Sequence, residues 1–176
     1  MMCDLFHYYD LSVGPFRNIS HLSDDEAQAV LERIRRENRG FAAGRRPEYL
    51  ARRRELEAVA RSELVRKSGS PLRSVPHYYV VGACPWLSSW FPEPAYVQVP
   101  ITAFDTRALS FTYGDLFPTF SPNVTDGRPY RRTVYTFGEI QRVIEQYGLP
   151  QVWNADGSFG PERYVEVQAW CDPPCV

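Results

Sequence analysis

The stretch FTYGDLFPTFSP, from Phe111 to Pro122, carries four aromatic side chains, one acid and two prolines directly after a short strand-like run. Gly114 lets the backbone turn where a larger residue would be strained, and the prolines stiffen the chain that follows. A Gly-Asp pair in this setting is not typical of a packed helix or a central strand. The sequence therefore predicts a loop. Either this loop lines a ligand site, or it is a structural loop whose aromatic side chains pack against the edge of the core.

The chain has 176 residues, of which 44% are hydrophobic and 14% aromatic, enough for one domain with a substantial core. No apolar run approaches the roughly 20 residues that a membrane-spanning helix needs. The first ten residues, MMCDLFHYYD, lack the basic start and the apolar middle of a secretory signal. We therefore expect a soluble cytoplasmic protein with no membrane partner.

Four cysteines are spread unevenly through the chain, at Cys3, Cys84, Cys171 and Cys175. Their number and spacing favour free thiols over a disulfide framework in a cytosolic chain of this length. No CxxC or HExxH spacing links them to the three scattered histidines, so the sequence predicts no metal site.

Basic residues are concentrated between Arg33 and Arg73, a stretch that holds 13 of the 20 Lys and Arg residues but only five glutamates. Such a segment is typical of a protein that meets phosphates, in a nucleic acid or a dinucleotide. The same composition also fits a solvated helix face with its own i, i+4 ion pairs, or a segment that docks on the acidic remainder of the chain.

Two helices are predicted in this basic region. Ser23 with Glu26 three residues later forms a capping box, which predicts a helix to about Asn38. A second helix is expected to begin near Pro47, a residue suited to a first helical position, and to run to about Lys67. Between the helices, Arg45 and Arg46 place two guanidinium groups near the N-terminus of the second helix. Helix N-termini favour anions, so the sequence predicts a phosphate-binding site here.

From residue 75 onward the composition changes to strand-forming residues. Strands are expected over 5–11, 76–82, 94–101, 109–113, 131–135 and 163–170, with a late helix over 136–148. The predicted fold is a single α+β domain, 1–176, with a basic helical segment 22–68 and a β-rich segment 75–170. Its sheet is expected to be mostly antiparallel, with two N-terminal helices and the one late helix.

The last predicted strand, RYVEVQAW, alternates clearly between two faces. One face carries small apolar residues, and the other carries Tyr164, Glu166, Gln168 and Trp170. A carboxylate and an amide between two rings suit a shallow polar site, with the loop at Tyr113 and Asp115 as the opposite wall. An exposed edge strand protected by a charge would show the same pattern.

The order of these segments resembles the ADP-ribosyltransferase fold, in particular the small toxin-type enzymes that modify DNA bases with NAD. The matching pieces are LFHYYDL with His7, PHYYVVG with Tyr78 or Tyr79, FTYGDLF, and RYVEVQ with Glu166. The resemblance spans most of the chain as an ordered set of short segments. Tyr164 stands two residues before Glu166, where members of that family often have Gln or Glu.

The resemblance implies NAD as cofactor and a nucleic acid or a protein as acceptor. The implied catalytic residues are Glu166, which stabilises positive charge on the ribose or orients the acceptor, and His7, which fixes the ribose hydroxyls. The cofactor-binding residues are expected to be Tyr79, Arg45, Arg46, Arg53, Tyr113 and Asp115. Of these, Tyr79 would stack on nicotinamide and the arginines would hold the pyrophosphate.

Two other functions fit the same residues. One is a non-catalytic nucleic-acid or protein-binding module that uses the Arg-rich helices and exposed aromatics. The other is a nucleotide or sugar hydrolase with Asp115 and Glu166 as a carboxylate pair, which requires the carboxyls to converge at roughly 5 to 9.5 Å. The chain contains no GxSxG elbow, GxGxxG fingerprint or phosphate-binding P-loop.

Overall fold

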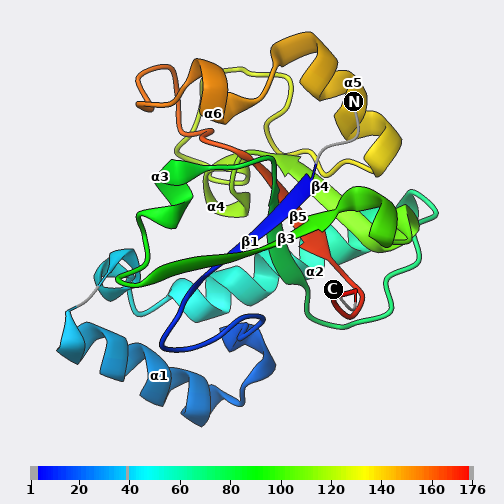
Figure 1. The fold of residues 1–176 in the computed structure, drawn as a ribbon. Helices are drawn as coiled ribbons and strands as arrows, with labels where there is room; N and C mark the ends of the chain where they lie inside the picture. Colours follow the sequence, from blue (N-terminus) through cyan, green and yellow to red (C-terminus); the bar gives the residue numbers. More distant parts are fainter. Residues whose placement is uncertain (1–3, 39, 175–176) are drawn as a thin grey trace.

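The computed structural model describes residues 4–38 and 40–174, which form an α+β domain around one sheet. The five-stranded sheet has the order β3-β1-β2-β5-β4, and every neighbouring pair is antiparallel (Figure 1). Its strands are β1 Asp4–Asp10, β2 His77–Val81, β3 Pro94–Pro100, β4 Leu109–Tyr113 and β5 Val165–Ala169. The predicted fold class is confirmed.

The three long helices lie where the sequence predicted them. They are α1 Asp24–Glu37, α2 Tyr49–Arg66 and α5 Phe137–Tyr147. The predicted capping box at Ser23 with Glu26 is present, and a second one, at Thr136 with Glu139, begins α5. Short helical segments connect the rest: α3 Pro85–Ser88, α4 Leu116–Thr119, α6 Pro150–Trp153, η1 Ile19–His21, η2 Phe41–Gly44, η3 Ile101–Ala103 and η4 Thr106–Ala108.

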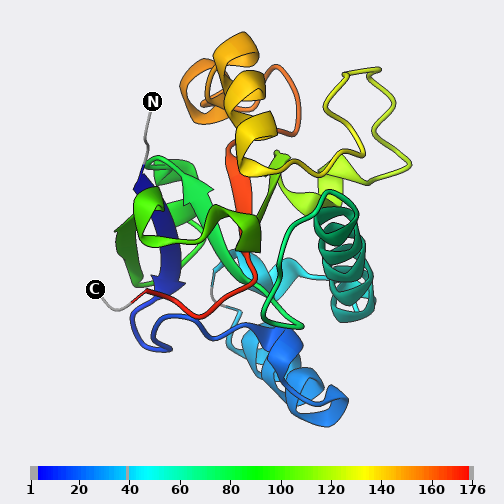
Figure 2. The same cartoon turned by 90° about the vertical axis from the view of Figure 1, so that its right-hand side faces the viewer.

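Different helices cover the two faces of the sheet. On one face α5 packs through Ile140 on a core that includes Leu5, Tyr79, Phe111 and Val167. On the other face lie α2, α3 and α4, while α1 lies at the far end of the molecule from α5 and α6 (Figures 1 and 2). Within the described ranges, no helix combines the length and the apolar character needed to cross a bilayer.

The last strand is not at an edge of the sheet. β5 pairs with β2 on one side and β4 on the other, and all five of its residues are buried. Its polar face, at Glu166 and Gln168, is covered by α2 and the chain around α4, and Trp170 just beyond it packs against Leu56 and Leu64. The edge-strand interpretation is therefore excluded.

The strand expected over 131–135 is reduced to a single bridge between Phe111 and Tyr135. Arg132 has a φ of 56°, in the left-handed region, which interrupts the extended run. Its backbone N–H bonds to the carbonyl of Thr119 at 2.9 Å instead of to a neighbouring strand.

Substitutions at two adjacent residues of α2, Leu64 and Val65, test how this helix packs on the sheet. Leu64 is 1% exposed and Val65 is 50% exposed. We expect Leu64→Ala to lower the free energy of unfolding by about 2–5 kcal/mol, because it leaves a cavity in the core. Val65→Ala should change it by less than about 0.5 kcal/mol. Urea denaturation measures both, and equal losses would contradict this orientation of α2.

Candidate active site

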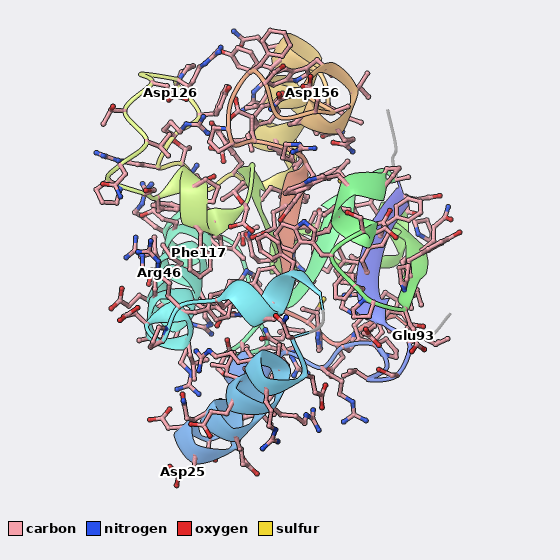
Figure 3. All side chains as sticks on the ribbon, turned by 90° about the vertical axis from the view of Figure 1, so that its left-hand side faces the viewer. Asp25, Arg46, Glu93, Phe117, Asp126 and Asp156 are labelled. Atoms are coloured by element: carbon pink, nitrogen blue, oxygen red, sulfur yellow. The ribbon has the colours of Figure 1, made fainter. Side chains whose placement is uncertain are left out.

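A cavity of about 840 Å³ lies between the sheet and the segments α1, η2 and α3. Its size falls in the range of small-molecule sites, roughly 300–1,000 Å³. Figure 3 views the side on which η2 crosses in front of the sheet, with α1 below it. The walls are largely aromatic: Phe6, Tyr8, Tyr78, Phe41, Tyr49, Trp86, Trp90 and Phe117.

The η2 segment is held over the cavity by one aromatic pair. The rings of Phe41 and Trp90 stack at 3.8 Å, and the Phe41 N–H donates to the Trp90 carbonyl at 3.1 Å. Gly40 has a φ of 72°, and a Cβ there would lie 2.8 Å from that carbonyl. Only glycine lets the chain pass this close to the Trp90 carbonyl.

Two acidic side chains lie together in the cavity wall, at Asp115 and Glu166. Glu166 is opposite Thr112 in the sheet, and the turn at Gly114, with a φ of 116°, carries the chain on to Asp115. The Phe117 N–H donates to Asp115 Oδ1 at 2.7 Å, and the Tyr164 hydroxyl donates to Oδ2 at 3.0 Å. Asp115 therefore meets Tyr164 and Glu166, two of the strand residues predicted to lie opposite the loop.

Burial makes these two acids unusual. It raises the pKa of Glu166 well above its usual range, and repulsion from Asp115 raises it further. Burial also raises the pKa of Asp115, although hydrogen bonds from Phe117 and Tyr164 oppose that change. Both oxygens of Asp115 accept hydrogen bonds that favour its ionised form, so we assign the proton to Glu166 when the pair carries one. Such a pair can supply both an acid and an anion to one substrate.

Two of the four arginines that line the cavity among the described residues, Arg45 and Arg53, act on the charge of Asp115, and they differ in how firmly they are held. Arg53 is fixed: its Nε donates to Glu57 at 3.0 Å, its Nη1 to the Tyr49 hydroxyl at 2.5 Å, and its guanidinium lies 4.5 Å from the Tyr78 ring centre. The Arg45 guanidinium lies 4.2 Å from the centre of the Tyr49 ring, and burial lowers its pKa. Its side chain has no hydrogen-bond or ion-pair partner among residues 4–38 and 40–174.

Six cations of the basic segment form ion pairs within the described part of the chain. The pairs join Arg52 to Glu55, Arg53 to Glu57, Arg54 to Asp24, Arg66 to Glu63, Lys67 to Glu139 and Arg73 to Asp172. Three join residues of one helix and three reach other segments. Ion pairs along the helix face and contacts with acidic residues of other segments therefore account for part of the concentrated charge. Arg45 is one of the cations that have no such partner among the described residues.

His7 and Tyr79 lie on the other face of the sheet from Glu166. In β2, Val80 is opposite Glu166, so its neighbour Tyr79 faces away, opposite Val167. The Tyr78 carbonyl accepts from His7 Nδ1 at 2.7 Å, and the Phe16 N–H donates to Nε2 at 2.9 Å, so the imidazole is a neutral, satisfied histidine. Burial lowers its pKa. Both residues border the cavity beside the loop after β1, but the sheet separates them from the acids.

Three further residues expected near the ligand do not line the cavity. Tyr113 points to the α5 face, where its hydroxyl donates to the Gly148 carbonyl at 2.7 Å. Trp170, expected in the wall opposite the loop, is buried under α2. Arg46 is exposed at the outer side of the molecule (Figure 3). Alternation along β4 turns Tyr113 to the α5 face, and the turn after η2 directs Arg46 outward.

Two residues that were not among the expected catalytic or cofactor-binding residues lie beside the acid pair. Tyr78 lies on the Glu166 face of β2, and its hydroxyl donates to Glu57 at 2.8 Å. Gln168 donates from its amide to Glu166 Oε1 at 2.9 Å. Register between β2 and β5 is the signal that separates Tyr78 from Tyr79, and single-strand alternation does not supply it.

Cys84 and Cys171 are free thiols, whereas Cys3 and Cys175 lie outside the described residues. In the part of the chain that the structure describes, no three His, Cys, Asp or Glu side chains form a metal-binding group. Comparison with protein families, with curated proteins and with solved structures gave no match. The site must therefore be interpreted from its own geometry.

The raised pKa of Glu166 predicts how stability changes with pH. Between the ordinary pKa of the unfolded chain and the raised pKa of the folded protein, the folded state holds a proton that the unfolded state has released. Stability contributed by Glu166 therefore falls as pH rises through this interval. We expect Glu166→Gln to become progressively more stable relative to wild type from about pH 5 to about pH 8.

Urea denaturation across this pH range measures the effect. Glu63→Gln is the control, because Arg66 lowers the pKa of Glu63 through a hydrogen bond at the surface. That variant should show no gain in stability at the higher pH. A constant difference between Glu166→Gln and wild type would contradict burial of a protonated Glu166.

Proposed function

We propose that this protein is an enzyme that breaks a glycosidic bond and transfers the sugar, with NAD as donor, as the resemblance to ADP-ribosyltransferases implies. The observation that carries the proposal is the buried pair of Asp115 and Glu166 in an aromatic cavity. Paired acids in distinct environments are typical of enzymes that act on glycosidic bonds. Aromatic walls suit the stacking of a base or a nicotinamide ring.

Arg45 supports a donor that carries phosphate. Its guanidinium presents unused N–H donors to the cavity, and guanidinium groups match phosphate oxygens in bidentate geometry. Arg53 adds a fixed positive charge, but Glu57 and Tyr49 occupy part of its donor set. We assign Arg45 as the main pyrophosphate contact and Arg53 as its electrostatic support.

NAD supplies a ribosyl group whose bond to the positively charged nicotinamide breaks without a proton. Glu166, once ionised, stabilises the positive charge that develops on the ribose. Asp115, anchored by Phe117 and Tyr164, takes the proton that the acceptor loses as it bonds to the sugar. Tyr78 is assigned to the nicotinamide in place of Tyr79, because it lies on the Glu166 face. His7 has no role here, since both of its nitrogens are engaged.

One observation favours a second candidate function. Because its pKa is raised, Glu166 is suited to donate a proton to a neutral leaving group, as a hydrolase of nucleosides or sugars requires. A non-catalytic binding module has less support, since the α2 cations that it would use are largely engaged in ion pairs. The nucleic-acid or protein acceptor and the cytoplasmic location stay predictions.

Release of nicotinamide from NAD tests the proposal directly. Wild-type protein should release nicotinamide, and Glu166→Gln should lose at least about a hundredfold in kcat/KM, because it lacks the charge that stabilises the ribose. Since Glu166 acts as an anion here, kcat/KM should rise as pH passes its raised pKa. A profile that falls over that range, with a neutral nucleoside as substrate, would support the hydrolase instead. No turnover of either substrate would refute both.

Arg45 and Arg46 form a matched pair for testing the phosphate contact. Arg45 lies in the cavity, whereas its neighbour Arg46 is exposed outside it. Arg45→Met should raise the KM for NAD by about tenfold to a hundredfold, the loss of a charge-assisted contact of about 1.5–3 kcal/mol. Arg46→Met should leave KM within about twofold. Steady-state kinetics at fixed ionic strength measures both, and equal effects would argue against a specific phosphate contact.

A further inference from the structure

Gln168 stands at the centre of a buried chain of hydrogen bonds behind Glu166. The Trp170 indole N–H donates to Ser110 Oγ at 2.9 Å, and the Ser110 hydroxyl donates to Gln168 Oε1 at 2.7 Å. The Gln168 amide nitrogen then donates to Glu166 Oε1 at 2.9 Å and to Thr112 Oγ1 at 3.3 Å. Gln168 is fully buried, as are Ser110, Thr112 and Trp170.

The direction of this chain is fixed by its ends. An indole N–H can only donate, so Ser110 accepts there and directs its own hydrogen to Gln168. At the other end Thr112 donates its hydrogen to the Gly114 carbonyl at 2.8 Å. A reversed amide would place the Gln168 oxygen against the Thr112 oxygen and leave the Ser110 hydrogen without its acceptor, which is costly in a buried network. The amide NH₂ group therefore faces Glu166.

In this orientation of the Gln168 amide, the two carboxyl oxygens of Glu166 have different hydrogen-bond partners. Oε1 accepts from the amide and has no room for a hydrogen on that side. No side chain of the described residues donates to Oε2, and Glu166 borders the cavity. The backbone N–H of Leu116 also favours the ionised form of the carboxyl. Oε2 is therefore the oxygen that can carry a proton without competing with the Gln168 amide.

We propose that Gln168 is a positioning residue, which holds Oε1 as a permanent acceptor and confines the exchangeable proton of Glu166 to Oε2. The inference rests on the proposed function in taking Glu166 as the acid–base group. Its effect extends beyond packing, because an amide N–H favours the ionised carboxyl and so lowers the pH at which Glu166 changes charge.

Four other charged or titratable groups act on Glu166. Asp115, at the start of α4, opposes its ionisation, and Arg53, on α2, favours it. Tyr78 on β2 and Tyr164 before β5 are neutral phenols, because burial raises the pKa of each well above its usual range. None of them bonds to the Gln168 amide, so a change at Gln168 can be separated from changes at these residues.

The test is infrared titration of the Glu166 carboxyl band, identified as the band absent from Glu166→Gln. Gln168→Met removes the N–H donor at similar volume, and we expect the midpoint to move upward by about one pH unit, since a hydrogen bond to a charged group contributes about that much. Gln168→Glu keeps an acceptor for Ser110 and adds a like charge, so it should also move the midpoint upward. It serves as the second variant if Gln168→Met does not fold.

Ser110→Ala is the control for a purely structural role. It breaks two bonds of the same network but leaves the amide donor to Glu166 in place. We expect this variant to lose stability and to keep the wild-type midpoint. An unchanged midpoint in the Gln168 variants, or an equal change in Ser110→Ala, would overturn the proposal.

The titration needs no substrate, so it is independent of the proposed function. If wild-type protein turns over NAD, the pH profile of kcat/KM should move upward in Gln168→Met together with the infrared midpoint. If wild type turns over neither NAD nor a nucleoside, the proposed function fails while the infrared result still decides the role of Gln168.

Discussion

The structure depends on one constraint, the burial of the polar face of β5 in the interior of the sheet. A carboxyl and an amide on a strand flanked by two others must find partners within the protein, because buried polar groups without hydrogen bonds are costly. Ser110 and Thr112 on β4 supply them, and α2 covers the rest. The same burial that requires this network also raises the pKa of Glu166. Packing and acid–base character therefore have one origin.

The sequence predicts the elements of this fold better than it predicts their contacts. Capping boxes and strand alternation are local patterns, so α1, α5 and β5 could be located from neighbouring residues alone. The choice between Tyr78 and Tyr79 depends on the register between β2 and β5, which no local pattern encodes. Likewise, Trp170 follows the polar alternation of β5, yet α2 covers it.

For the predicted site too, local sequence patterns are more informative than expectations about tertiary contacts. Glu166 and Asp115 were found because an acid among aromatic side chains is conspicuous, and the turn at Gly114 does bring them together. The resemblance implies a catalytic role for His7, but both of its nitrogens are used in holding the loop at Phe16 to β2. Composition identifies residues capable of chemistry, whereas tertiary hydrogen bonds decide which of them remain available for it.

Glu57 makes Arg53 a more rigidly held cation than Arg45. Its Oε1 accepts from Ser20, Arg53 and Tyr78, and so ties the chain before α1 to α2 and β2 at a single atom. Arg53 is thereby a cation whose position is set during folding, before any ligand arrives. Arg45, resting on a ring and free of acceptors among the described residues, can adjust to what enters. The cavity thus combines a preorganised charge, which lowers the cost of holding an anion, with an adaptable one, which tolerates variation in its shape.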